Sequence, residues 1–246
     1  MTEQDRQHAI RLKLSRPPVR PADSFIPTGF TALDAALGGG LPRGRILELF
    51  GPSSCGKTTL ALQTAAHLQS SGLTIGWIDA DHTFDPAYAA SLGVSIDRLI
   101  VLQPAFAEQA LAMACRLAAS SAVDLIVVDS AAALVPMLEL ETAIGESGYG
   151  LQARVLASGL RKLAAEAARS GAATLFLNQL RGRSEAVEDE TTAGGPSLKL
   201  HASARIALRP ASAARVRFRI LKNKAAASFA SGELAWTPSR GFTESP

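Results

Sequence analysis

Hydrophobic residues along the chain fall into short continuous runs that alternate with longer amphipathic, alanine-rich stretches. The runs are rich in β-branched residues and predict strands at 46–50, 74–78, 99–102, 125–129 and 174–178. The stretches between them predict helices at 58–71, 86–92, 107–120 and 151–170. Strands that are apolar throughout and separated by helices indicate an α/β fold, with a mostly parallel sheet covered by helices on both faces.

Both ends of the chain depart from this alternation. Near the C-terminus, segments 204–208, 216–221 and 233–236 predict strands joined by short turns, which indicates antiparallel pairing at one sheet edge. At the N-terminus, three prolines between residues 17 and 21 prevent a short leading helix from continuing. We therefore expect a flexible or docking leader at 1–24, a core domain at 25–238 and a tail at 239–246.

Composition narrows the class of protein. A chain of 246 residues can bury one large core, and 47% hydrophobic with 19% charged residues argues against a disordered chain. No apolar run reaches the roughly 18 residues of a transmembrane helix, so no membrane partner is expected. The charged start is unlike a signal peptide, and Cys55 and Cys115 make no disulfide framework. These features favour a cytoplasmic location.

The net charge of +3 is unevenly distributed along the chain. Residues 1–22 carry five Lys or Arg against two Asp or Glu, and residues 205–246 carry eight against two. The middle of the chain is acidic. The basic ends are either ordinary solvated surface or a contact for a polyanion such as nucleic acid.

The most specific motif is a complete G-x-x-x-x-G-K-[ST] loop between a predicted strand and a predicted helix. It consists of Gly51, Pro52, Ser53, Ser54, Cys55, Gly56, Lys57 and Thr58, and Thr59 follows. The glycines let backbone N–H groups point at phosphate oxygens, and the helix N-terminus adds a positive dipole. Lys57 supplies a cation to the β- and γ-phosphates, and Thr58 supplies a hydroxyl to Mg²⁺. Cys55 either fills space or has a redox role. The motif predicts binding of ATP with Mg²⁺.

Carboxylates follow two further predicted strands. Asp129 ends the apolar run 125–129, and with Thr58 it is expected to hold Mg²⁺, partly through water. Asp81, just past the strand at 74–78, is the candidate group to orient and deprotonate an attacking water. Asp79 competes for that role but lies closer to the strand. Either carboxylate could instead cap a turn or a helix.

From about Phe25 to Trp236 the sequence resembles the bacterial RecA recombinase family. The resemblance is carried by segments 27–29, 33–34, 38–42, 51–59, 78–82, 85–88, 103–104, 108–110, 127–134, 178–181, 194–195 and 222–224. It implies a RecA-type P-loop NTPase core with a mostly parallel sheet and an antiparallel C-terminal edge. It also implies a role in DNA repair and recombination.

The resemblance implies roles for residues outside the phosphate loop. Asp85 and Tyr88 would border the adenine, with Tyr88 stacking on it. Gln179 would sense the γ-phosphate and link it to the DNA-binding loop that follows. Lys222 and Lys224 would reach the ATP of a neighbouring subunit. ATP would then join protomers of a filament, made of this chain or of RecA, on single-stranded DNA.

The resemblance further implies two DNA-binding loops, at 142–150 and 180–195. The candidate phosphate contacts are Arg154, Arg161, Arg181, Gly194 and Gly195. Apart from the resemblance, the two arginines in the predicted helix 151–170 are equally well interpreted as solvated helix cations.

The sequence departs from the family pattern in three places. Asp81 stands where the family has glutamate, which withdraws the carboxylate by about 1.5 Å, a shift that can lower a rate on the order of 10²-fold. The second DNA loop is short, and four carboxylates at 185 and 188–190 repel phosphate. The chain ends ten residues after Trp236, so we expect the family's C-terminal domain to be absent.

These departures leave three functions open. The first is an ImuA-like accessory ATPase of DNA-damage tolerance in the SOS response, working with RecA filaments or with an error-prone polymerase in translesion synthesis. The second is a full recombinase that catalyses homologous pairing and strand exchange. The third is a non-hydrolysing ATP-binding interaction module. Intact nucleotide chemistry beside an altered DNA loop favours the accessory role.

Overall fold

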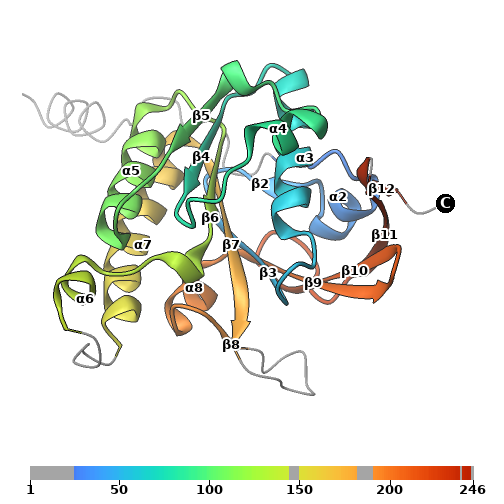
Figure 1. Cartoon of the computed structure of the whole chain (residues 1–246). Coiled ribbons are helices and arrows are strands. Elements are labelled where there is room, and N and C mark those ends of the chain that lie inside the picture. The colour runs from blue at the N-terminus through green and yellow to red at the C-terminus, as the bar shows by residue number, and fades with distance from the viewer. Residues whose placement is uncertain (1–24, 144–149, 182–190, 239, 245–246) are drawn as a thin grey trace, which may run out of the picture.

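The five apolar runs of the sequence form the parallel strands of a large sheet. They are β3 (Ile46–Gly51), β4 (Ile75–Asp79), β5 (Leu99–Leu102), β6 (Leu125–Asp129) and β7 (Ala173–Arg181). The computed structural model describes residues 25–143, 150–181, 191–238 and 240–244 (Figure 1). The leader at 1–24 and the middle parts of both expected DNA loops, 144–149 and 182–190, lie outside the described residues.

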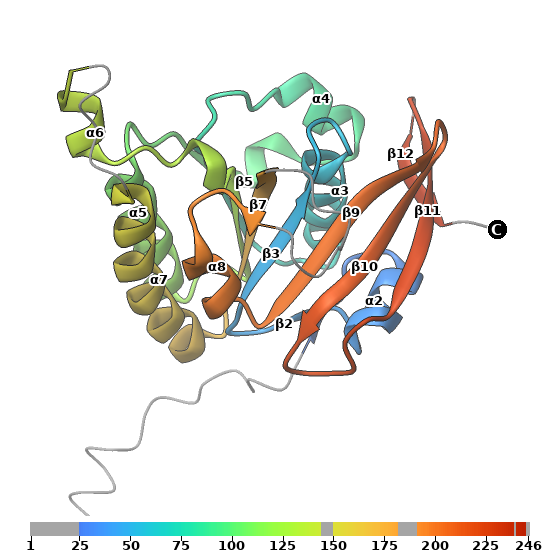
Figure 2. The ribbon, with the colours of Figure 1, turned by 90° about the horizontal axis from the view of Figure 1, so that it is seen from below.

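The C-terminal part of the chain extends this sheet on one side. β9 (Ala204–Ser212) pairs in parallel with β3, and β10 (Arg215–Asn223), β11 (Ser231–Thr237) and β12 (Gly241–Glu244) follow in antiparallel order (Figure 2). The strand order is β12-β11-β10-β9-β3-β7-β6-β4-β5, and β8 (Thr191–Thr192) pairs with β7. The antiparallel edge predicted from the sequence is confirmed.

The C-terminal boundary of the core differs from the expected one. The sequence predicts that the core ends at residue 238, but β12 begins at Gly241, pairs with β11 and packs on α3. A strand of four residues is too short to show an alternating hydrophobic pattern, and its partners lie elsewhere in the chain. The sheet therefore includes part of the segment that was expected to be a tail.

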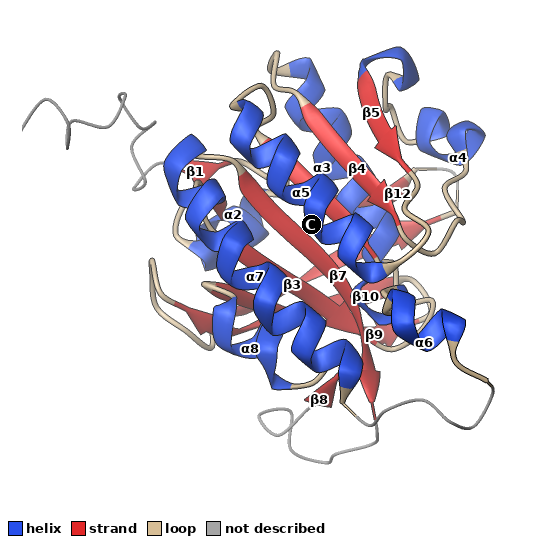
Figure 3. Ribbon diagram, turned by 90° about the vertical axis from the view of Figure 1, so that its left-hand side faces the viewer, coloured by secondary structure: helices blue, strands red, loops and turns tan. Residues whose placement is uncertain are grey.

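Helices cover both faces of the sheet, as predicted (Figures 1 and 3). One face carries α2 (Thr31–Leu37), α3 (Lys57–Ser70) and α4 (Pro86–Ser91), and the other carries α5 (Ala107–Ser120), α7 (Leu151–Ser170) and α8 (Pro196–His201). The short helix α6 (Met137–Glu141), two 3-10 helices at Ile96–Arg98 and Ala131–Ala133, and a small sheet of β1 (Phe25–Ile26) with β2 (Leu41–Pro42) complete the described elements. None of the described helices combines the length and apolar character needed to cross a membrane.

The hydrophobic core forms two layers, one on each face of the sheet. Trp77 and Leu60 belong to the cluster under α3, whereas Phe176 and Leu160 belong to the cluster under α5 and α7. All four side chains are at most 2% exposed. Burial on both faces explains why most positions of the parallel strands are apolar, rather than only alternate positions.

A buried ion pair crosses the middle of the sheet. The fully buried carboxylate of Glu48 on β3 accepts a hydrogen bond from Arg205 Nε on β9. It also accepts one from Asn178 Nδ2 on β7, at 2.8 Å. The Arg205 guanidinium lies 4.5 Å from the centroid of the Phe50 ring. Because an unpaired buried charge is costly, the three polar groups hold β9, β3 and β7 together as a unit.

We expect the variant Arg205→Met to lose about 3–5 kcal/mol of the free energy of unfolding, because it leaves the Glu48 carboxylate buried without its cation. The double variant Glu48→Leu/Arg205→Met removes both charges and should be more stable than Arg205→Met alone. Urea denaturation of both single variants and the double variant measures this coupling. Additive losses would show that the two side chains do not stabilise each other.

Candidate nucleotide-binding site

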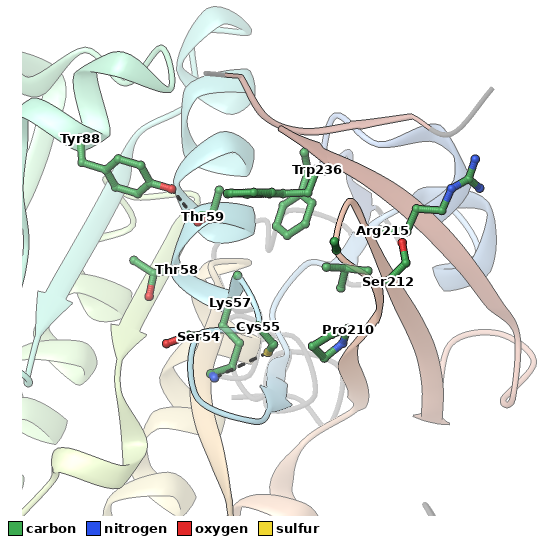
Figure 4. A pocket seen from close by; sticks show the side chains of 14 residues that line it. Ser54, Cys55, Lys57, Thr58, Thr59, Tyr88, Pro210, Ser212, Arg215 and Trp236 are labelled. Carbon is green, nitrogen blue, oxygen red and sulfur yellow. Dashed lines mark hydrogen bonds between the residues drawn. The ribbon is translucent and has the colours of Figure 1, made fainter. Parts of the chain in front are cut away.

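A cavity of about 370 Å³ opens beside the phosphate-binding loop, where β3 leads into α3. Figure 4 shows the loop and the start of α3 at its centre, Tyr88 of α4 on one side and the C-terminal strands on the other. The lining residues are Ser54, Cys55, Gly56, Lys57, Thr58, Thr59, Tyr88, Pro210, Ser212, Ala213, Arg215, Val216, Trp236 and Phe242. The cavity thus combines the predicted loop with side chains from distant segments.

The loop has the geometry that its motif predicts. Gly56 has a φ of 92°, in the left-handed region that favours glycine, and α3 begins directly after it at Lys57. The Lys57 side chain is buried, and its Nζ donates to the carbonyl oxygens of Pro52 at 2.7 Å and Gly51 at 3.3 Å. The first-turn N–H groups of α3 and this ammonium together favour an anion at the loop.

Cys55 is buried inside the loop, with its Sγ 3.8 Å from Lys57 Nζ. Burial raises the pKa of the Cys55 thiol, and the neighbouring Lys57 lowers it. A thiol that stays protonated is a poor nucleophile, so this environment favours the space-filling role over the redox role. Ser53 and Ser54 are exposed, and Ser54 lines the cavity.

Thr58 and Asp129 are in contact although 71 residues separate them in the sequence. Thr58 Oγ1 donates to Asp129 Oδ2 at 2.9 Å. Burial raises the pKa of Asp129 to about 6; the charges of Asp81 and Asp79 act in the same direction, and the Thr58 bond and Lys57 oppose it. Hydroxyl and carboxylate oxygens are hard ligands of the kind that Mg²⁺ prefers, and a bound cation would favour ionised Asp129. The pair therefore fits the predicted magnesium site.

The two carboxylates that follow the β4 run have different partners. Asp79 is 1% exposed and accepts from two backbone N–H groups of the following turn and from Gln103 Nε2. Asp81 is half-buried and accepts from the backbone N–H of Ser130 at 3.2 Å and from its hydroxyl at 3.1 Å. Asp79 therefore closes a turn, and Asp81 lies next to the residue that follows Asp129.

Asp85 and Tyr88 lie at the start of α4. The Asp85 carboxylate accepts from the backbone N–H groups of Ala87 at 2.8 Å and Tyr88 at 3.1 Å, and so caps the helix. The Tyr88 hydroxyl forms a 2.7 Å hydrogen bond with Thr59 Oγ1, and its ring is 39% exposed in the cavity wall. Their contacts with adenine stay a prediction, with the Tyr88 ring the better placed of the two.

The parallel register of β3 and β7 places Gln179 directly beside Gly51 at the start of the phosphate loop. The Gln179 side chain is exposed at the end of β7, and its backbone N–H donates to Asn178 Oδ1 at 2.8 Å. Asn178 is the residue bonded to Glu48. Gln179 thus lies beside the phosphate loop, shortly before the second expected DNA loop. Its sensing role stays a prediction.

Lys222 lies at the end of β10 that is far from the cavity, and Lys224 follows directly after this strand. Val216 of the same strand lines the cavity, and six strand residues span about 20 Å. Lys222 Nζ donates to the carbonyl oxygens of Lys199 at 2.7 Å and Leu200 at 3.1 Å. Burial and then the charge of Lys224 lower the pKa of Lys222. The position suits contact with the ATP of another copy, which stays a prediction.

Four of the DNA-contact candidates lie near the ends of β7 and α7. Arg181 ends β7, and Arg154 is exposed on the first turns of α7. Gly194 and Gly195 pack against α7, where a Cβ on Gly194 would stand 2.3 Å from Leu156 Cδ1. The two glycines therefore lie against the first turns of α7, which also carry Arg154. Residues 182–190, which follow Arg181, lie outside the described ranges.

Arg161 lies farther along α7, apart from the other DNA-contact candidates. Burial lowers the pKa of His201, and the charges of Arg161, Lys222 and Lys224 lower it further. The charge of Arg161 thus acts on the same histidine as the charges of Lys222 and Lys224. Its assignment as a DNA contact stays a prediction.

Sequence reasoning missed the wall of the cavity that the C-terminal strands form. Trp236 on β11 and Phe242 on β12 are register partners and both line the cavity. Ser212 and Arg215 flank the β9–β10 turn and line it as well. No motif marks these residues. The one available signal was Trp236 itself, a large aromatic residue in a chain with only 5% aromatic residues.

Replacing the Asp129 carboxylate with an amide should separate stability from nucleotide binding. The pKa of Asp129 is raised to about 6 in the folded protein, so the fold favours the protonated carboxyl group. The free energy of unfolding that this preference contributes is lost as the pH rises through about 6. We expect Asp129→Asn to be more stable than the wild type near pH 8, and this advantage to shrink by about 1 kcal/mol near pH 5. ATP affinity should fall in the same variant.

Urea denaturation at both pH values measures the stability change, and calorimetric titration with ATP and Mg²⁺ measures the affinity. Thr58→Val is the matched control, because it removes the hydrogen bond but keeps the buried charge. A pH-independent difference between Asp129→Asn and the wild type would contradict the raised pKa.

Comparison with known proteins identifies relatives over most of the chain. The family model of the RecA N-terminal domain matches residues 10–243. Protein RecA of Frankia alni is 47% identical over 226 residues, which cover 87% of this chain and 65% of that protein. Protein RecA of Gloeobacter violaceus is 45% identical over 219 residues, which cover 85% of this chain and 59% of that protein. The chain thus spans less than two thirds of the length of these relatives.

Among solved structures, the RadB recombinase matches with a TM-score of 0.72 at 21% sequence identity. The match covers 90% of this chain and 100% of the RadB chain, and it shows the shared fold. The range that the family model matches includes the phosphate loop, Asp129 and the antiparallel strands β10 and β11. The chain therefore belongs to the RecA family, in the part that corresponds to the RecA N-terminal ATPase domain.

Proposed function

We propose that the protein is a Mg²⁺-dependent ATPase of DNA repair that acts as an accessory or regulator of RecA filaments or of error-prone translesion synthesis. The observation that carries the ATPase part is the Thr58–Asp129 contact next to buried Lys57. This contact brings the start of α3, which follows β3, next to the end of β6, and so places the phosphate-binding and metal-binding groups together. The altered second DNA loop, with four carboxylates at 185 and 188–190, supports the accessory part.

In this proposal each side chain of the site has a distinct task. Lys57 and the first turn of α3 hold the phosphates, and Thr58 and Asp129 hold Mg²⁺, which neutralises phosphate charge when bound. Asp81 orients the attacking water and accepts its proton. Gln179 responds to the γ-phosphate beside Gly51 and transmits its presence along β7 towards the loop at 180–195.

The positions of Lys222 and Lys224 bear on how copies of the chain would assemble. Lys222, near the end of β10, and Lys224, just after it, are too far from the cavity to reach the nucleotide of their own chain. We assign them to the ATP of an adjacent subunit, either a second copy of this chain or RecA. Single-stranded DNA would then bind weakly, because the loop carboxylates oppose contacts from Arg181 and Arg154. Asp85 and Tyr88 would border the adenine.

Two alternatives remain open, each with its own support. Identity of 45–47% to RecA proteins over most of the chain favours a full recombinase that performs strand exchange. The shorter carboxylate at Asp81 favours an ATP-binding interaction module that does not hydrolyse its nucleotide.

Measuring ATP turnover against single-stranded DNA concentration, with and without full-length RecA, tests the proposal. We expect slow turnover that DNA stimulates and that Lys57→Ala abolishes, because the variant loses the phosphate cation. We also expect an altered rate of RecA-catalysed strand exchange, with no joint molecules formed by this protein alone. Efficient joint molecules without RecA would establish the recombinase. ATP binding without turnover would establish the non-hydrolysing module.

The variant Asp81→Glu tests the proposed general base. One additional methylene restores the reach of the carboxylate, and we expect ATP turnover to rise about tenfold or more with little change in ATP affinity. Asp79→Glu is the matched control, because Asp79 closes a turn and its extension should lower stability without raising turnover. An unchanged or lower rate in Asp81→Glu would remove Asp81 from the proposed reaction.

A further inference from the structure

The side chain of Gln63, on the middle of α3, holds the last described strand against this helix. Gln63 Nε2 donates to the carbonyl oxygens of Arg240 and Phe242, both at 3.0 Å. Gln63 Oε1 accepts from the backbone N–H of Phe242 at 2.8 Å. The amide thus reproduces, on one edge of β12, the pairing that a neighbouring strand would supply. β11 occupies the other edge.

Two glycines allow the close approach that these bonds require. A Cβ on Gly241 would stand 2.7 Å from Gln63 Oε1, and Gly241 has a φ of 69°. A Cβ on Gly56, in the phosphate loop, would stand 2.4 Å from Cζ of the Phe242 ring. The Phe242 ring is therefore packed directly on the phosphate loop, and the Gln63 amide fixes its backbone.

Phe242 and Trp236 together form an aromatic wall of the cavity. They are register partners on adjacent antiparallel strands, so their side chains lie next to each other on the same face of the sheet. Figure 4 shows Trp236 and Tyr88 on either side of Thr59. Aromatic side chains in the same cavity as a phosphate loop suit a flat, apolar nucleobase rather than a charged group.

We propose that Gln63 is a positioning residue for the nucleobase: by tethering β12 to the phosphate-loop helix, it holds Phe242 and Trp236 as the wall against which the base of the nucleotide binds. The inference rests on the proposed function, since it assumes that a nucleotide occupies the cavity. It concerns the base alone, because the phosphates are held by the loop backbone and Lys57, which precede Gln63 on the same helix.

Calorimetric titrations with ADP and with inorganic pyrophosphate, both with Mg²⁺, separate the two parts of the nucleotide. We expect Gln63→Ala to weaken ADP binding about tenfold, because the three hydrogen bonds that hold the backbone of Arg240 and Phe242 are lost. Pyrophosphate binding should change less than about twofold, because pyrophosphate has no base. Phe242→Ala, which keeps the tether but removes the ring, should show the same selective loss. Equal weakening of both probes would overturn the proposal.

Gln69 supplies a matched control on the same helix. Its amide makes an equivalent pair of bonds to the backbone of Ser95, at 3.0 Å and 2.8 Å, away from the cavity. Gln69→Ala should lower stability as Gln63→Ala does but leave both affinities unchanged. If Gln69→Ala weakened ADP as strongly, the effect would reflect general stability and the proposal would fail.

The same titrations distinguish failure of the inference from failure of the proposed function. A wild-type protein that binds neither ADP nor pyrophosphate would contradict the nucleotide site itself. A wild-type protein that binds both, with Gln63→Ala equal to it for both probes, would contradict only the positioning role of Gln63.

Discussion

The arrangement of the functional groups depends on the buried carboxylate of Glu48. It bonds to Arg205 on one neighbouring strand and to Asn178 on the other, in the centre of the sheet. The strand that carries it leads into the phosphate loop, and the residue after Asn178 is Gln179. A charge buried at this depth is tolerated only with its partners in place, so the contact specifies the strand order β9-β3-β7. The relative positions of the phosphate loop and Gln179 follow from that order.

The carboxyl end of the sheet concentrates negative charge in a site of low solvent access. Asp129, Asp81 and Asp79 lie close enough for the latter two charges to raise the pKa of the first, which burial has already raised. In a purely structural region such an arrangement would be unfavourable. Under the proposed function, a cation held by Thr58 and Asp129 would offset this charge. The perturbed pKa thus marks the functional end of the sheet on physical grounds.

The nucleotide cavity has two walls of different origin. The loop, the start of α3 and Tyr88 come from the first hundred residues, whereas Trp236 and Phe242 come from the last dozen. The two parts meet because β9 joins the parallel sheet beside β3 and the following hairpins fold back over α3. The Gln63 amide then connects the last strand to the phosphate-loop helix. The proposed base site therefore combines both ends of the described chain, with Tyr88 from one end and Trp236 and Phe242 from the other.

The sequence alone determined the features that depend on local pattern. Apolar runs that are buried on both faces located the five parallel strands, and helical spacing located α3, α5 and α7 nearly to the residue. The phosphate loop and Asp129 were equally visible, because their chemistry needs fixed residue types at fixed spacing next to a strand. Tertiary structure alone decided which of Asp79 and Asp81 is free of the turn, because that depends on hydrogen bonds to Gln103 and Ser130. It also decided that Trp236, Phe242 and Gln63 share one site, since contacts across about 180 residues leave no periodic signal in the sequence.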